Sequence, residues 1–280
     1  MIPFVGLASG LGAGNEGCQG GPIVIQNHTP DAHWQTMIHS SPSISSKWEQ
    51  IPALNTQLAK AIFSCATKHP FVVSIGGDHS CAVGTWSGIA EATRLQQKDI
   101  GLIWIDAHMD SHTPETSETG NIHGMPLAAL LGHGPTSLSH ILSEKPKIKP
   151  ENLFLVGIRS YEEAEKRLLE KLNVRVYLMN EVKQRGLHAV FAEILQNLSH
   201  RKILYGISLD VDFFDPSEII ATGTPVAEGG LPQDFLDSYC LFESYPPIAF
   251  ELVEFNPSKD IGNATLKHIL NILRRVTQRM

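Results

Sequence analysis

The chain has 280 residues, of which 42% are hydrophobic and 18% charged, a balance that excludes disordered, collagen-like and coiled-coil proteins. Its net charge of −7 offers a phosphate backbone no attraction, so no nucleic acid is expected as a partner. No apolar run approaches the roughly 20 residues that a membrane span requires, and the four cysteines form no CxxC pair. We therefore expect a cytoplasmic protein that does not enter a membrane.

Short apolar segments alternate with longer amphipathic segments along the chain. The amphipathic segments predict helices over residues 54–68, 162–172 and 182–198, and a last helix with its apolar face on Leu266, Ile269, Leu270, Leu273 and Val276. The apolar segments are typical of buried parallel strands, which we predict at residues 2–7, 71–75, 101–105, 153–158, 174–178, 203–209 and 248–253. No repeat or linker interrupts this order, so the sequence predicts one α/β domain over residues 1–280, with a parallel sheet covered on both faces.

A glycine-rich segment, Gly12-Ala-Gly14-Asn-Glu-Gly17, follows the first predicted strand and matches the pattern GxGxxG. A dinucleotide site would need a helix to open there, whereas Gly20, Gly21 and Pro22 are expected to continue the loop. The segment is therefore not interpreted as a nucleotide site.

Three candidate metal ligands, Asp106, His108 and Asp110, follow the strand at 101–105 at alternating positions. Side chains two residues apart on a strand lie on one face about 6 to 7 Å apart, so they can converge on bound ions. The alternative is that these are solvated loop residues after a strand. However, the same pattern recurs at Asp210 and Asp212. Buried carboxylates without partners are costly, and their recurrence at strand ends favours ligation.

A third strand end supplies His79, after two glycines that permit a tight turn. The three strand ends together offer four carboxylates and two imidazoles and no thiolate. Such ligands suit Mn²⁺ or a similar divalent ion, and six of them exceed the needs of one tetrahedral zinc. Two ions about 3.5 to 4 Å apart activate water at neutral pH, which indicates hydrolytic chemistry.

These motifs resemble those of the ureohydrolases, the family of arginase, agmatinase and formimidoylglutamase. The resemblance rests on GGDHS, DAHMD and SLDVD and continues, in family order, through residues 120–124, 157–160, 222–225 and 253–257. It implies a three-layer αβα fold around a mostly parallel sheet of about eight strands. It also implies two Mn²⁺ ions per chain and hydrolysis of a guanidino group through a hydroxide that bridges the metals.

The resemblance also implies individual roles. His79, Asp106, Asp110 and Asp210 would hold one manganese ion, and Asp106, His108, Asp210 and Asp212 the other, with Asp106 and Asp210 as bridges. The same ligands could accept Co²⁺, Fe²⁺ or Ni²⁺. Glu254 would bind the guanidinium, Thr224 would border its pocket, and His123 would shuttle protons. We count Asp110, His123 and Glu254 as the catalytic residues.

Two segments are expected to bind the far end of the substrate. Residues 111–119 resemble the arginase loop that binds the α-carboxylate, with His112 where arginases usually have Asn and Thr119 where they usually have Ser. Glu162 and Glu165 resemble the acidic residues that receive the α-amino group, with Glu162 in place of the common Asp. These departures argue against strict selectivity for arginine.

The leading hypothesis is therefore an arginase-type hydrolase that converts L-arginine into L-ornithine and urea. An agmatinase or a hydrolase of another guanidino acid is the alternative, although agmatine has no carboxylate for His112 and Thr119. A metal-dependent deacetylase on the same fold is less favoured, since such enzymes use one zinc ion and paired histidines. A non-catalytic binding protein is disfavoured because all six ligands are present. The family resemblance implies a homo-oligomer, a trimer or hexamer.

Overall fold

The computed structural model describes residues 1–14, 16–40 and 45–278. Its eight strands form one sheet in the order β2-β1-β3-β8-β7-β4-β5-β6, and every neighbouring pair is parallel. The strands are β1 (Pro3–Ala8), β2 (His33–His39), β3 (Val72–Gly76), β4 (Ile100–Ile105), β5 (Leu153–Ile158), β6 (Arg175–Leu178), β7 (Leu204–Asp210) and β8 (Ala249–Val253). The predicted α/β class and parallel sheet are confirmed.

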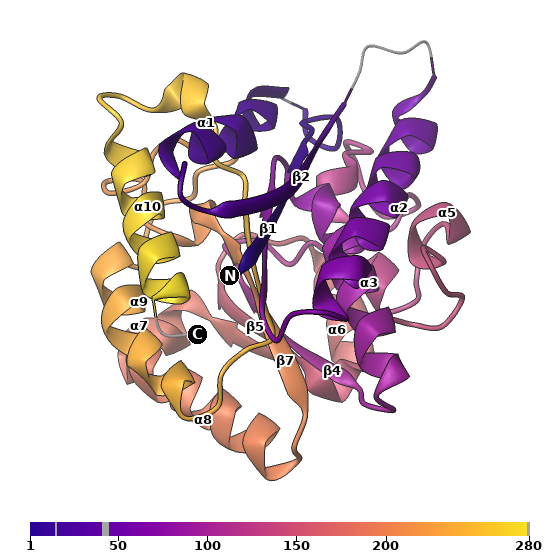
Figure 1. The fold of residues 1–280 in the computed structure, drawn as a ribbon. Helices are drawn as coiled ribbons and strands as arrows, with labels where there is room; N and C mark the ends of the chain where they lie inside the picture. Colours follow the sequence, from indigo (N-terminus) through magenta and orange to yellow (C-terminus); the bar gives the residue numbers. More distant parts are fainter. Residues whose placement is uncertain (15, 41–44, 279–280) are drawn as a thin grey trace.

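Helices cover both faces of this sheet, which gives three layers (Figure 1). One face packs against α2 (Lys47–Ala66), α3 (Ala82–Leu95), α4 (Pro126–Leu130) and α6 (Glu163–Lys171), with α5 (Thr136–Ser139) beside α2. The other face packs against α1 (Gly21–His28), α7 (Met179–Arg185), α8 (Leu187–His200), α9 (Pro232–Ser238) and α10 (Ala264–Thr277). Alternate residues of each strand enter the two cores, as the two-residue period of a strand requires.

Short 3₁₀ turns join several of these elements. They are η1 (Glu16–Gly20), η2 (His79–Cys81), η3 (Ile122–Gly124), η4 (Pro150–Asn152), η5 (Val211–Phe213), η6 (Tyr239–Glu243) and η7 (Pro257–Lys259). Two of them lie at the carboxyl edge of the sheet: η2 begins three residues after the end of β3, and η5 directly follows β7.

Two sequence predictions are wrong in detail. The helix predicted at 182–198 is divided by Gly186, whose φ of 83° lies in the left-handed region, so α7 ends before it and α8 begins after it. Gly21 and Pro22 do not continue a loop but begin α1, where proline fits the first helical turn.

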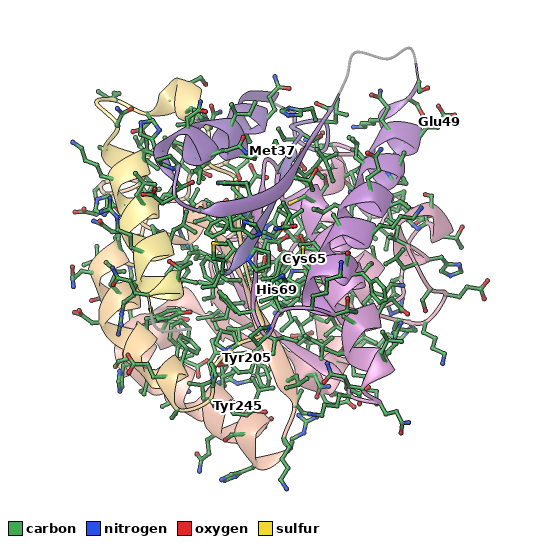
Figure 2. The ribbon with its side chains drawn as sticks, in the orientation of Figure 1. Met37, Glu49, Cys65, His69, Tyr205 and Tyr245 are labelled. Carbon is green, nitrogen blue, oxygen red and sulfur yellow. The ribbon has the colours of Figure 1, made fainter. Side chains whose placement is uncertain are left out.

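Four neighbouring strands, β3, β8, β7 and β4, occupy the middle of the sheet. Parallel strands share one carboxyl edge, so the segments that follow these four strands meet there. At the other end of β7, Tyr205 stacks on Tyr245 with ring centroids 5.5 Å apart, and Figure 2 shows the two rings close together.

None of the described helices is both long and apolar enough to cross a lipid bilayer.

Candidate metal centre

His79 lies at the centre of the converging side chains. It follows β3, and its Nδ1 lies 3.1 Å from one carboxylate oxygen each of Asp106, Asp110 and Asp210. Its ring stacks on that of Trp104, with centroids 4.0 Å apart and an interplanar angle of 6°. The imidazole is therefore fixed in place with one nitrogen directed at three carboxylates.

His108 forms the second part of the cluster, after β4. Its Nδ1 lies 3.1 Å from Asp212 Oδ2 and 3.5 Å from Asp106 Oδ1. Asp106 is thus close to both imidazoles, and it also accepts a hydrogen bond of 2.9 Å from Trp104 Nε1. Five of the six predicted ligands gather as two groups that share Asp106, namely His79, Asp106 and Asp210 and Asp106, His108 and Asp212. The sixth, Asp110, joins the first group through its contact with His79.

The donor set fits divalent cations better than it fits an internal hydrogen-bond network. His79 Nδ1 is buried and forms no properly directed hydrogen bond with any described residue, although three carboxylate oxygens surround it. Four carboxylates at such short range repel each other unless positive charge lies between them. Oxygen and imidazole donors without sulfur are the ligands of hard or borderline divalent ions.

The pKa values reflect this crowding of acids. Burial and the charge of Asp106 raise the pKa of Asp110 to about 7, and burial with the charges of Asp212 and Asp106 raises that of Asp210. Burial disfavours the charged form of His79, but the three carboxylates that lie 3.1 Å from its Nδ1 outweigh burial and raise its pKa. A metal ion that binds here must displace the protons that these groups hold.

Glu254 lies directly after β8 and is almost fully buried. Its Oε1 accepts a hydrogen bond of 2.9 Å from the backbone N–H of His79 and lies 3.1 Å from His123 Nδ1. Its Oε2 accepts a hydrogen bond of 3.1 Å from the thiol of Cys18. Burial and the nearby Glu254 raise the pKa of that thiol, which keeps it a donor.

A cavity of about 190 Å³ opens beside this cluster. His108, Asp110, Asp210, His123 and Thr224 line it, together with the four residues predicted to bind the far end of the substrate, which are His112, Thr119, Glu162 and Glu165. Thr224 Oγ1 donates a hydrogen bond of 3.1 Å to Asp212 Oδ2. Glu254 does not line the cavity but contacts it through His123.

His112 connects the loop after β4 to the start of α6. Its Nε2 lies 3.1 Å from Glu162 Oε2 and 3.3 Å from Glu165 Oε2, and its Nδ1 lies 3.1 Å from Thr116 Oγ1. Glu165 also accepts hydrogen bonds from the backbone N–H groups of Ser111 and Glu162. Thr119 is exposed at the cavity rim, where its hydroxyl accepts a hydrogen bond from the Asn121 N–H.

The glycines near the site permit close approach of backbone segments. A Cβ on Gly77 would come 2.0 Å from the Ser9 carbonyl oxygen, so close packing explains this glycine better than turn geometry. Gly12 donates its N–H to Asp78 Oδ2 and accepts the N–H of His123 with its carbonyl. The glycine-rich segment thus supports the loop that presents His123.

Three buried residues near the cluster were not predicted from the sequence. Cys18, which lies in η1, gives no recognisable signal, since it has no other cysteine near it in the sequence. Ser208 and Glu251 lie inside the apolar runs that became β7 and β8, and a charged residue within such a run is the signal that could have identified Glu251.

Comparison with known proteins agrees with this geometry. A family model described as the arginase family matches residues 2–277. An arginase of Bacillus caldovelox is 41% identical over 213 residues, which cover 75% of this chain and 70% of that protein. An arginase of Bacillus subtilis is 38% identical over 220 residues, or 78% of this chain and 73% of that protein. A crystal structure of arginase from Bacillus subtilis superposes with a TM-score of 0.89 at 32% identity, covering 100% of this chain and 99% of the other.

Proposed function

The chain belongs to the arginase family, and on that premise we propose that it is a binuclear metal hydrolase that converts L-arginine and water into L-ornithine and urea. The observation that supports this most is the convergence of six candidate ligands, Asp110 among them through its contact with His79, beside a cavity whose far wall is acidic. One wall can hold metal ions near the guanidino carbon, and the other can receive an α-amino group.

In this proposal His79, Asp106, Asp110 and Asp210 hold one ion, and Asp106, His108, Asp210 and Asp212 the other. Two such ions supply a nucleophile from water at neutral pH. The chain itself contributes four carboxylates, which balance the cations and let a positively charged substrate approach. Asp110 is also assigned a catalytic role because it lines the cavity.

Glu254 is proposed to bind the substrate guanidinium and turn its central carbon toward the nucleophile. Its Oε1 is paired with His123, so an incoming guanidinium would displace that imidazole. His123 remains at the cavity wall, where it can transfer a proton between the site and solvent. Thr224 borders the same part of the cavity and holds Asp212.

The remaining cavity residues would select the amino-acid end of the substrate. His112 and Thr119 are proposed to donate hydrogen bonds to the α-carboxylate. Glu162, which is largely exposed beside His112, would receive the α-amino group, and Glu165 would hold the first turn of α6 in place.

Several finer assignments belong to the same proposal. We propose Mn²⁺ as the metal, with Co²⁺, Fe²⁺ or Ni²⁺ as substitutes for the same ligands. We also propose that residues 1–280 form a single domain, that the enzyme acts in the cytoplasm, and that it assembles as a homo-oligomer, a trimer or hexamer.

The test is urea release by protein reconstituted with Mn²⁺, with L-arginine, agmatine and a panel of guanidino acids compared at equal concentration. We expect arginine to be preferred by orders of magnitude. Preference for agmatine would refute the assigned roles of His112 and Thr119. No urea from any guanidine, but deacetylation with one bound zinc ion, would refute both the guanidino substrate and the two-metal site.

A further inference from the structure

Glu251 is a fully buried carboxylate in the middle of the sheet, outside the metal cluster. It lies on β8 between Ser74 of β3 and Ser208 of β7, which are its register partners, and its exposed fraction is 0%. A carboxylate at such a position is costly unless hydrogen bonds satisfy it. Its partners therefore indicate why the fold retains it.

Two of its contacts are short and directed. Glu251 Oε2 accepts a hydrogen bond of 2.8 Å from Trp86 Nε1 and another of 2.7 Å from the Ser208 hydroxyl. The Ser208 oxygen lies 3.0 Å from His79 Nε2. A continuous path thus joins Glu251, through one hydroxyl, to the imidazole whose other nitrogen faces three carboxylates.

The directions of the hydrogen bonds along this path are determined by chemistry. A histidine that ligates a cation through Nδ1 must carry its proton on Nε2, which then donates to Ser208 Oγ. The single hydroxyl hydrogen of Ser208 is then available only for Glu251 Oε2. Each hydrogen bond in the path can therefore have only one direction, and the path ends at the carboxylate of Glu251, which accepts.

We propose that Glu251 is a positioning residue that acts through Ser208 to hold His79 in the tautomer and orientation in which Nδ1 binds metal. The inference rests on the proposed metal centre. Ligating histidines commonly donate their second N–H to a carboxylate, which orients the ring and increases its basicity. Here the carboxylate acts through an intervening hydroxyl.

The effect should be confined to one of the two ions. His108 has a side chain that is 25% exposed, and its Nε2 has no hydrogen-bond partner in the described part of the chain. Of the two candidate ligand histidines, only His79 has a buried path of this kind among the described residues. Disruption of the path should therefore weaken the ion held by His79 and spare the ion held by His108 and Asp212.

The experiment measures Mn²⁺ binding directly. Calorimetric titration gives the two affinities, and electron paramagnetic resonance distinguishes a coupled pair of ions from a single ion. Ser208→Ala and Glu251→Gln should each weaken one equivalent about 10- to 100-fold, the usual effect of losing such an outer partner. The double variant should bind no more weakly than Ser208→Ala alone, because both substitutions interrupt one path.

Trp86→Phe is the matched control, since it removes the other hydrogen bond to Glu251 Oε2 and keeps an aromatic ring in the core. It should lower the melting temperature and leave both Mn²⁺ affinities within about twofold, the scatter expected for uncoupled sites. If Glu251→Gln does not fold, Ser208→Ala alone still tests the path, because serine and alanine differ by one hydroxyl.

Unchanged affinities in Ser208→Ala, equal weakening of both ions, or additive effects in the double variant would each overturn the inference. Unaltered protein that binds two Mn²⁺ ions and hydrolyses arginine would meanwhile uphold the proposed function. Unaltered protein that binds no metal would refute that function, and the inference with it.

Discussion

His123 and an incoming guanidinium compete for the same carboxylate oxygen of Glu254. Burial disfavours a charged His123, but its hydrogen bond to Glu254 outweighs burial and raises its pKa to about 9. The same contact lowers the pKa of Glu254 despite burial. Without metal, the imidazole at neutral pH is therefore a cation that occupies the position proposed for the substrate.

This competition predicts how substrate binding depends on pH. Loss of the His123 proton removes its attraction to Glu254, so the KM for arginine should fall as the pH rises through the pKa of His123 in the metal-loaded enzyme. His123→Asn should remove this change, and comparison on the same substrate cancels the titration of the substrate's own amino group. The same pH profile of KM in both proteins would show that the pair does not gate binding.

His123→Asn should also reduce turnover while leaving the metals in place. Loss of a positioned acid or base costs about 10² to 10⁴-fold in rate. The Nδ1 contact of His123 is with Glu254, which is not a proposed metal ligand, so Mn²⁺ stoichiometry should remain two. Steady-state kinetics and metal analysis of the same preparation measure both quantities, and normal turnover would remove the shuttle role.

The predicted metal ligands and the unpredicted supporting residues differ for a physical reason. Asp106, His108, Asp110 and Asp210 were identifiable because aspartate and histidine at the ends of apolar strands are unusual and because the carboxyl ends of parallel strands meet. Ser208 gives no such signal, since a small polar residue inside a strand is common. Its importance depends on which residue of β8 lies beside it, and register cannot be read from one strand.

The first turn of α6 and the loop at 111–119 behave as one unit. Glu165 binds the N–H groups of Ser111 and Glu162, while His112 lies between Glu162 and Glu165. The helix start and the loop thus determine each other's position.

His112→Ala should raise the KM for arginine and leave kcat nearly unchanged. A hydrogen bond to a charged group contributes about 1.5–3 kcal/mol, and 1.4 kcal/mol corresponds to tenfold, so the rise should be roughly tenfold or more. Agmatine lacks the carboxylate and should show little change. A substitution that raises KM and leaves kcat unchanged removes an interaction that is equally strong in the ground state and the transition state.

Glu163→Gln is the matched control for this change. Glu163 lies on the same helical turn, is exposed, and pairs with Arg167 instead of lining the cavity. It should leave both KM values unaltered. If His112→Ala raised the KM for arginine and the KM for agmatine equally, His112 would support the loop and would not bind the carboxylate.

Elements were predicted where their burial pattern is distinctive. The strands buried on both faces and the amphipathic α10 were found, whereas β2 and α3 were missed. The edge strand β2 is half-buried and contains His33 and Gln35, so it lacks an apolar run. Helix α3 is buried on nearly every side and therefore shows no apolar stripe.

At the scale of the whole molecule, the metal centre is a concentration of buried acid at the carboxyl edge of the sheet. Without metal, burial and neighbouring charge raise the pKa of Asp110 to about 7, above its value of about 3.8 in an unfolded chain. A carboxyl group with a raised folded pKa contributes stability below about pH 4 that is lost as pH rises through 7. Metal-free protein should therefore lose stability over this range.

Bound metal should reverse this trend. Each ion present at 100 times its Kd adds about 2.7 kcal/mol to the free energy of unfolding, and chains of comparable length gain roughly 2–4 °C per kcal/mol. Two ions should therefore raise the melting temperature by on the order of 10 °C. The difference between Mn²⁺-loaded and chelated protein should widen from pH 5 to pH 8, because fewer protons compete for Asp110 and Asp210.

Calorimetric melting curves with Mn²⁺ and with chelator, recorded across that pH range, measure the difference. Asp210→Ala is the informative comparison, since it removes a carboxylate proposed to bridge both ions and should abolish metal loading and turnover together. Its melting temperature should be the same with Mn²⁺ and with chelator. In the unaltered protein, the difference in melting temperature between Mn²⁺-loaded and chelated samples could instead narrow as the pH rises. That result would mean that the carboxylates at this edge of the sheet do not hold the metal, and that its binding site lies elsewhere in the fold.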